Sequence, residues 1–212
     1  MTSEDILWNI ASVLPVSTVN GPGRRVVIWV QGCTLKCPGC FSPELQPHEP
    51  RWLVEPVTFA QDVTDMCKKH CCEGITITGG EPLQQSRALE LFTQKIKEMG
   101  YSTVVFTGYT WEKVVQTDNK SIQNILKNID IVIAGPYDPE NNDDPRTWNN
   151  NKDKDIMFLT DRYSSESMDY SNLEVVIDFD IAIVTGFPNG SDITEVTNLL
   201  STSDCIIASR EE

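Results

Sequence analysis

Apolar and polar residues alternate with two different periods along the first 135 residues. Four short apolar runs are typical of buried strands: residues 24–31, 74–78, 102–108 and 129–135. Three stretches between them show helical spacing: residues 57–72, Pro82 to about Met99, and 110–128. This alternation of strand and helix predicts parallel βαβ units and an α/β fold.

The length of the chain limits how complete such a fold can be. A full (β/α)8 barrel needs about 250 residues, whereas this chain has 212. The sequence therefore predicts a partial (β/α) barrel of about six mostly parallel strands, open on one side.

Beyond residue 135 the regular alternation of strand and helix patterns ends. Residues 136–155 are polar and rich in Asn and Asp, which is typical of a long loop. IMFLT follows, then LEVVIDFDIAIVTGF (173–187) predicts one or two strands, and 192–207 is helical or mixed. We expect residues 1–160 to form the core and 161–212 a β-containing C-terminal extension packed on the same domain.

The charge narrows the possible partners. The formal net charge is −14, which disfavours nucleic acid and anionic membrane surfaces, since both are bound through Lys and Arg. The N-terminus has acidic residues where a signal peptide is basic, and no apolar stretch is long enough to cross a bilayer. A cytoplasmic location is expected, and in that reducing compartment the seven cysteines predict metal ligands or redox groups rather than disulfides.

Three of these cysteines are clustered in one short loop. Residues 31–44, QGCTLKCPGCFSPE, place Cys33, Cys37 and Cys40 in a C-x3-C-x2-C pattern directly after the first predicted strand. Structural zinc sites use four ligands, and neither His48 nor His70 has a spacing that completes the set. A 4Fe-4S cluster held by three thiolates leaves one iron open for another ligand. A zinc-binding or purely structural loop is the alternative.

The segments around the cysteines resemble a known enzyme family. The C-x3-C-x2-C pattern is the signature of the radical S-adenosylmethionine (SAM) enzymes, and GPGRRVVIWVQGC (21–33) resembles the segment that precedes it in glycyl-radical-enzyme activases. TGGEPL (78–83) resembles the superfamily's Gly-Gly-Glu segment. VVFTGYTWE (104–112), DIVIAGPYD (130–138) and, more loosely, RTWNNNKDK (146–154) resemble segments of the anaerobic ribonucleotide reductase activating enzymes.

This resemblance implies two cofactors, a 4Fe-4S cluster and S-adenosyl-L-methionine. The metal ligands would be Cys33, Cys37 and Cys40, and no separate catalytic side chain is expected. The residues expected to bind the cofactors lie in the cysteine loop and at two strand ends: Gly39, Cys40, Phe41, Thr78, Gly79, Gly80, Glu81, Thr107 and Gly108. Gly79 and Gly80 lack a Cβ, which lets the backbone approach a ligand closely, and Glu81 would fix backbone or accept a hydrogen bond from SAM.

The implied function is reductive cleavage of SAM to a 5′-deoxyadenosyl radical. That radical would abstract hydrogen from a glycine of a partner glycyl radical enzyme, such as an anaerobic ribonucleotide reductase, with flavodoxin or ferredoxin as reductant. Modification of another peptide or a small molecule is one alternative, and a non-catalytic metal-binding module is another. Cys67 and Cys71 share an apolar helix face with Ala60 and Val63 and are expected to pack in the core, and Cys205 is expected to pack as well.

Overall fold

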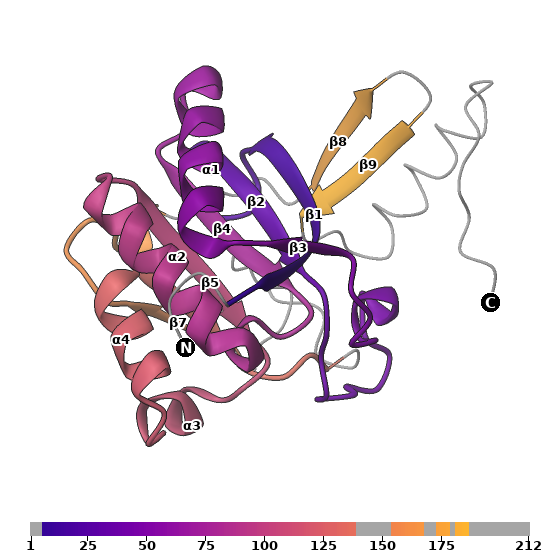
Figure 1. Cartoon of the computed structure of the whole chain (residues 1–212), viewed down its shortest axis with the longest axis vertical. Helices are drawn as coiled ribbons and strands as arrows, with labels where there is room; N and C mark the ends of the chain where they lie inside the picture. The colour runs from indigo at the N-terminus through magenta and orange to yellow at the C-terminus, as the bar shows by residue number, and fades with distance from the viewer. Residues whose placement is uncertain (1–5, 139–153, 168–172, 179–180, 187–212) are drawn as a thin grey trace.

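The computed structural model describes residues 6–138, 154–167, 173–178 and 181–186. Its central element is a seven-stranded sheet with the strand order β3-β1-β2-β4-β5-β6-β7 (Figure 1). The strands are β1 (Trp8–Ser17), β2 (Arg25–Val30), β3 (Trp52–Val54), β4 (Gly74–Gly79), β5 (Ser102–Thr107), β6 (Ile131–Ala134) and β7 (Asp155–Phe158).

The centre of the sheet is parallel, as predicted. β2, β4, β5 and β6 are neighbours in this order and all run in the same direction. β1, β3 and β7 pair antiparallel with their neighbours at the two sides. The predicted α/β class is therefore confirmed, while the closure of the sheet into a partial barrel stays a prediction.

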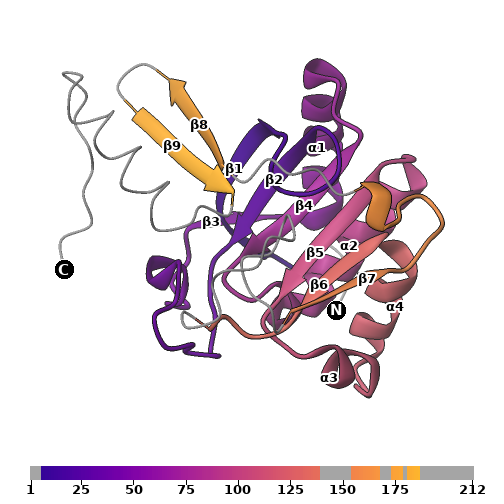
Figure 2. The same ribbon diagram turned by 180° about the vertical axis from the view of Figure 1, so that it is seen from behind.

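The helices cover one face of this sheet (Figures 1 and 2). They are α1 (Pro56–His70), α2 (Ser86–Glu98), α3 (Trp111–Val115) and α4 (Lys120–Asn128), with 3-10 turns at Pro43–Leu45, Pro82–Gln85 and Ser165–Ser167. The core beneath them contains an aromatic cluster in which Trp8 lies 4.8 Å from Phe92 and 6.2 Å from Phe59, between ring centroids.

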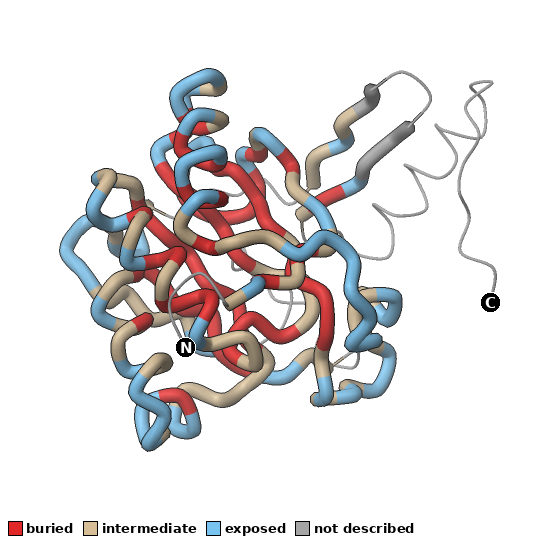
Figure 3. The backbone as a smooth tube through the Cα atoms, in the orientation of Figure 1, coloured by how far each residue is buried: buried red, intermediate tan, exposed pale blue. Residues whose placement is uncertain are grey.

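Strand alternation separates this core from the opposite face of the sheet. Val105 belongs to the core under the helices, whereas its neighbours Val104 and Phe106 pack with Ile131 and Ile133 on the other face. Figure 3 shows the sheet as the most continuously buried part of the molecule. The helix-free face is therefore the one on which a ligand can lie against the strands.

A separate two-stranded hairpin, β8 (Leu173–Asp178) and β9 (Ile181–Gly186), lies beside β1 and β2 (Figures 1 and 2). The Thr18 N–H donates to Glu174 Oε2 at 3.2 Å, and Asn20 Nδ2 donates to Thr185 Oγ1 at 2.9 Å. The strands predicted between 173 and 187 are confirmed, and the boundary of the extension at residue 161 stays a prediction. The helical or mixed segment 192–207 and Cys205 lie outside the described residues.

The end of α1 differs from the prediction. Cys67 is fully buried and Cys72 nearly so, but Cys71 is exposed. The helix ends at His70, and Cys71 adopts a left-handed conformation with φ of 53° that turns the chain away from the apolar face. The expectation that Cys71 packs in the core is wrong because the helix stops one residue before it. In the described part of the chain, no helix is long and apolar enough to span a membrane.

Candidate metal and cofactor site

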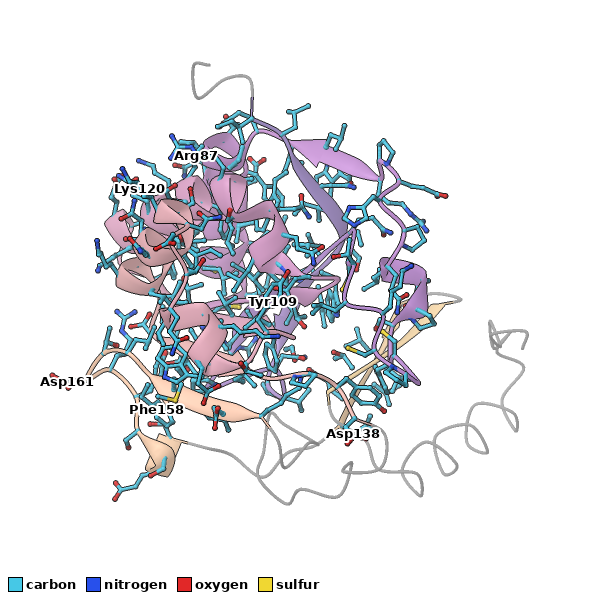
Figure 4. All side chains as sticks on the ribbon, turned by 90° about the horizontal axis from the view of Figure 1, so that it is seen from below. Arg87, Tyr109, Lys120, Asp138, Phe158 and Asp161 are labelled. Atoms are coloured by element: carbon cyan, nitrogen blue, oxygen red, sulfur yellow. The ribbon has the colours of Figure 1, made fainter. Side chains whose placement is uncertain are left out.

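A pocket of about 450 Å³ lies on the helix-free face of the sheet, at the carboxyl ends of β2, β4 and β5. This volume is within the range of small-molecule sites, roughly 300–1,000 Å³. Figure 4 looks onto this end of the molecule, with Tyr109 near the centre and Asp138 on the side of the hairpin. In parallel α/β folds, ligands bind at the carboxyl ends of the strands.

The pocket brings together nearly all the residues predicted from the sequence. It is lined by Cys33, Cys37, Cys40, Phe41, Thr78, Gly79, Gly80, Glu81, Thr107 and Gly108. Gly39 is the exception among them: it is exposed, has φ of 61°, and is not part of the lining. Gly39 forms the turn that brings Cys40 back toward Cys37, whose carbonyl accepts the Cys40 N–H at 3.2 Å.

The cysteine loop is held by backbone hydrogen bonds to its own far end. Gly32 N–H donates to Leu45 O at 2.8 Å, and Cys33 N–H donates to Gln46 O at 2.9 Å. A second link joins the loop to the 3-10 turn after β4, where the Thr34 N–H donates to Gln84 Oε1 at 3.1 Å and Gln84 Nε2 donates to Tyr109 Oη at 3.1 Å. The two ends of the loop, and Cys33 with them, are thus held by hydrogen bonds within the protein.

The three thiols have the chemistry that an iron–sulfur cluster requires. All are free and half-buried, and they line the same pocket. The Leu35 N–H lies 3.5 Å from Cys33 Sγ, and burial raises the pKa of the Cys33 thiol above its ordinary value. Among the described residues, no three His, Cys, Asp or Glu side chains are grouped as ligands of a single metal ion. The three thiols and the space in front of them fit a multi-iron cluster.

The double glycine makes close contact with the cysteine loop itself. Gly80 N–H donates to Val30 O at 2.8 Å, and Glu81 N–H donates to Gly32 O at 2.9 Å. A Cβ on Gly80 would overlap the carbonyl oxygen of Gly32. In the structure, the close approach of Gly79 and Gly80 is to the end of β2 and the start of the cysteine loop, and their approach to a bound ligand stays a prediction.

We expect Gly80→Ala to disturb the cysteine loop. The added methyl group must displace Gly32, which breaks the Glu81–Gly32 hydrogen bond and moves Cys33, at about 1–3 kcal/mol for the overpacking. The measurements are iron bound per chain after anaerobic reconstitution, and the free energy of unfolding. Gly100→Ala is the control, because a Cβ on Gly100 meets no atom within 4 Å, although Gly100, unlike Gly80, has a positive φ, of 83°. That variant should lose about 1 kcal/mol of stability and keep its iron, and equal iron loss in both would contradict the prediction.

Glu81 is fully buried and joins two strand ends. Its Oε1 accepts hydrogen bonds from Leu83 N–H and Thr107 Oγ1, both at 2.9 Å, and its Oε2 accepts one from Gly108 N–H at 2.8 Å. Burial raises the pKa of this carboxyl, and the three donors oppose that shift. The expectation that Glu81 fixes backbone is confirmed, and the hydrogen bond from SAM stays a prediction.

The pocket also contains residues that sequence reasoning missed: Trp29, Leu35, Phe106, Tyr137, Lys154 and Thr185. Lys154 is a half-buried cation whose pKa is lowered by burial, with the Glu81 carboxylate as the largest opposing influence. The sequence contains one indication that Lys154 belongs to the site: it lies in the segment 146–154, which resembles a segment of the activating enzymes. The sequence placed Trp29 and Phe106 in strands but did not show which face of the sheet their side chains lie on. Residues 139–153, the rest of that loop, lie outside the described residues.

Asp130 and Asp138 lie on either side of β6 in the sequence. Asp130 precedes β6 at the opposite end of the sheet, where it accepts hydrogen bonds from Thr103 N–H at 2.9 Å and Thr160 Oγ1 at 2.7 Å. It is therefore a backbone-binding residue. Asp138 lies near the pocket end (Figure 4) but does not belong to the lining.

Comparison with known proteins decides the family. A family model described as "4Fe-4S single cluster domain" matches residues 19–157. The chain belongs to this family. The match includes the cysteine loop, the double glycine and all of β2 to β6. The 4Fe-4S single cluster domain therefore ends before the β8–β9 hairpin begins.

Individual relatives point in the same direction. The anaerobic ribonucleoside-triphosphate reductase-activating protein of phage T4 is 29% identical over 154 residues, which cover 67% of this chain and 94% of the relative. The protein of that name from Escherichia coli is 26% identical, covering 71% and 99%. A pyruvate formate-lyase-activating enzyme from Staphylococcus epidermidis is 30% identical, covering 59% of this chain and 51% of that enzyme. The predicted resemblance to radical SAM activating enzymes is confirmed.

Proposed function

We propose that this protein is a radical SAM activase that generates a glycyl radical on a partner enzyme, most specifically an anaerobic ribonucleotide reductase. The observation that carries the proposal is the convergence of three free cysteines with the Gly-Gly-Glu strand end in one pocket. Two relatives named for activating the anaerobic reductase match over more than nine-tenths of their own length, which supports this target over pyruvate formate-lyase.

Each part of the pocket has a role in this proposal. Cys33, Cys37 and Cys40 would hold a 4Fe-4S cluster, and the strand ends Thr78–Glu81 and Thr107–Gly108 would bind SAM beside it. When bound, the cluster and SAM together supply a 5′-deoxyadenosyl radical by reductive cleavage. The protein orients the reacting groups at near-attack distance and limits the access of water.

The hydrogen bonds of Glu81 support the positioning role. This carboxylate joins the end of β4 to the end of β5 through Thr107 and Gly108, so the two segments proposed to bind SAM are linked directly. The backbone bond from Glu81 to Gly32 links the cysteine loop to them as well. A cluster and SAM bound here would therefore be held close to each other, which reductive cleavage of SAM requires.

Anaerobic reconstitution tests the proposal in two stages. The protein should become brown, bind about four irons and four sulfides per chain, and form 5′-deoxyadenosine and methionine from SAM under dithionite. Mixing with an anaerobic ribonucleoside-triphosphate reductase should then give a glycine-centred radical by electron paramagnetic resonance. A colourless zinc protein that leaves SAM intact would establish the metal-binding module instead.

A further inference from the structure

Both chain neighbours of Cys33 are held by one turn. Gly32 O accepts the Glu81 N–H at 2.9 Å, and the Thr34 N–H donates to Gln84 Oε1 at 3.1 Å. Glu81 is the N-cap of the 3-10 turn that contains Gln84, and the Gln84 N–H donates to Glu81 O at 3.1 Å. The backbone on both sides of Cys33 is therefore fixed by the turn that follows the double glycine.

The Gln84 side chain contributes more than one of these contacts. In addition to the bond from the Thr34 N–H, its Nε2 donates to Thr34 Oγ1 at 2.8 Å and to Tyr109 Oη at 3.1 Å. An amide has one acceptor oxygen and two N–H donors, and here the oxygen and both donors have partners. Two of the three bonds are made to one residue of the cysteine loop, which fixes the orientation of that residue as well as its distance.

The third bond reaches the end of β5. Tyr109, near the centre of Figure 4, directly follows Gly108 of the pocket lining. The Tyr109 N–H donates to Thr107 Oγ1 at 3.2 Å, and Thr107 Oγ1 donates to Glu81 Oε1 at 2.9 Å. These contacts form a closed ring that runs from the cysteine loop through Gln84 and the end of β5 back to Glu81. The members of such a network strengthen one another.

We propose that Gln84 is a positioning residue, which holds Cys33 at a fixed place relative to the end of β5. The inference rests on the proposed function, because these two segments would bind the cluster and SAM. Gln84 does not line the pocket, so it acts through the residues that it holds. Its amide is neutral and adds no charge beside the thiols and Glu81. Placement matters because a displacement of about 1 Å can cost about 100-fold in rate.

Alkylation of the full-length chain before reconstitution measures how firmly the loop is held. Trypsin cleaves at both ends of residues 26–36, so Cys33 is measured on a peptide that contains no other cysteine. Gln84→Leu removes all three bonds and keeps a side chain of similar size. We expect Cys33 in this variant to react with iodoacetamide about tenfold faster, because the loop opens more easily. Cys71, which is exposed at the end of α1, should react at the wild-type rate.

A second measurement follows SAM binding to the reconstituted protein. Electron paramagnetic resonance of the reduced protein, titrated with SAM, gives the SAM concentration at half-saturation. Gln84→Leu should still bind about four irons per chain, because the backbone bonds that join the two ends of the loop remain. We expect it to need about tenfold more SAM, and Tyr109→Phe, which removes the third bond alone, about threefold more. In the double variant Tyr109→Phe should add nothing, because its partner is already absent.

Gln94→Leu is the matched control. Gln94 is an exposed glutamine of α2 whose Nε2 donates to Glu98 Oε1 at 3.2 Å, and its replacement should leave both measurements at wild-type values. Unchanged Cys33 alkylation or unchanged SAM half-saturation in Gln84→Leu would overturn the positioning role. Additive effects of Gln84→Leu and Tyr109→Phe would overturn it too.

Two further outcomes are separated by the same experiments. If circular dichroism shows that Gln84→Leu does not fold, Tyr109→Phe decides, and an unchanged SAM titration in that variant overturns the inference. A wild-type chain that binds no iron–sulfur cluster, or that leaves SAM intact, would instead overturn the proposed function. The alkylation rate of Cys33 needs neither cofactor, so it would still decide whether Gln84 holds the cysteine loop.

Discussion

Cys37→Ala should reduce SAM cleavage to background and leave the reconstituted protein nearly colourless. Cys37 is one of three thiols that line the pocket, and no histidine in the sequence has a spacing that would replace it. A cluster that already has one open iron would keep only two protein ligands, and cysteine thiolates are what hold such clusters in proteins. Iron and sulfide per chain, together with 5′-deoxyadenosine formed under dithionite, are the measurements.

Cys71→Ala is the matched control for this prediction. Cys71 is exposed at the end of α1 and does not line the pocket, so this variant should keep its colour and most of its activity. The circular dichroism spectra of both variants should match the wild type, because Cys37 is half-buried in a loop held by backbone hydrogen bonds. Equal losses of iron in the two variants would indicate a second cluster and contradict the single-site assignment.

The parallel centre of the fold was predictable because its signals are local. Each of β2, β4, β5 and β6 is a short run of apolar and β-branched residues ahead of a turn, and α1 and α2 show helical spacing. The candidate site followed from the same information, since a motif that comes directly after a parallel strand must lie at the carboxyl edge of the sheet. Chain order alone therefore placed the cysteines near the double glycine.

The antiparallel additions were not predictable in the same way. β1 precedes the first predicted strand and contains Pro15, which weakens a strand signal, and β3 has only three residues. Their pairing depends on partners far along the chain. Among the described residues, hydrogen bonds from Thr18 and Asn20 link the hairpin to the main body, and no local pattern encodes them.

The sequence also does not show which of the adjacent residues Arg24 and Arg25 is buried. Arg24 is exposed, and its Nε donates to His70 O at 3.1 Å. Arg25 is fully buried at the start of β2. The sequence contains both residues in one motif, GPGRR, and only the position of β2 between β1 and β4 decides which side chain enters the interior.

Arg25 binds the start of the sheet with all parts of its guanidinium. Nε donates to Thr76 Oγ1 at 2.9 Å, and Nη2 donates to Ile75 O at 2.9 Å and Ser102 O at 3.3 Å. Nη1 donates to Pro22 O at 3.0 Å and Ser102 Oγ at 3.1 Å. Burial lowers the pKa of Arg25 from its ordinary value, which shows the cost of holding this charge away from water. No described carboxylate forms an ion pair with it.

Arg25→Met should therefore lower the free energy of unfolding by about 3 kcal/mol or more. Two effects oppose each other, because the variant no longer buries a charge but loses five hydrogen bonds from a charged donor. Each such bond contributes about 1.5–3 kcal/mol, and a buried acceptor left without a donor costs about 1–3 kcal/mol. The lost bonds exceed the saving, because their acceptors are neutral carbonyls and hydroxyls that remain buried whether or not the charge is present.

Urea unfolding of the reconstituted protein under anaerobic conditions measures this loss, with Arg24→Met as the control. Arg24 is an exposed arginine with one hydrogen bond to a carbonyl, so its replacement should change stability by less than about 1 kcal/mol. Equal effects of the two substitutions would show that Arg25 acts through its general charge rather than through its contacts. Because Arg25 lies at the end of the sheet opposite the cysteines, the folded fraction of Arg25→Met should still bind iron, which separates a role in folding from a role in the site.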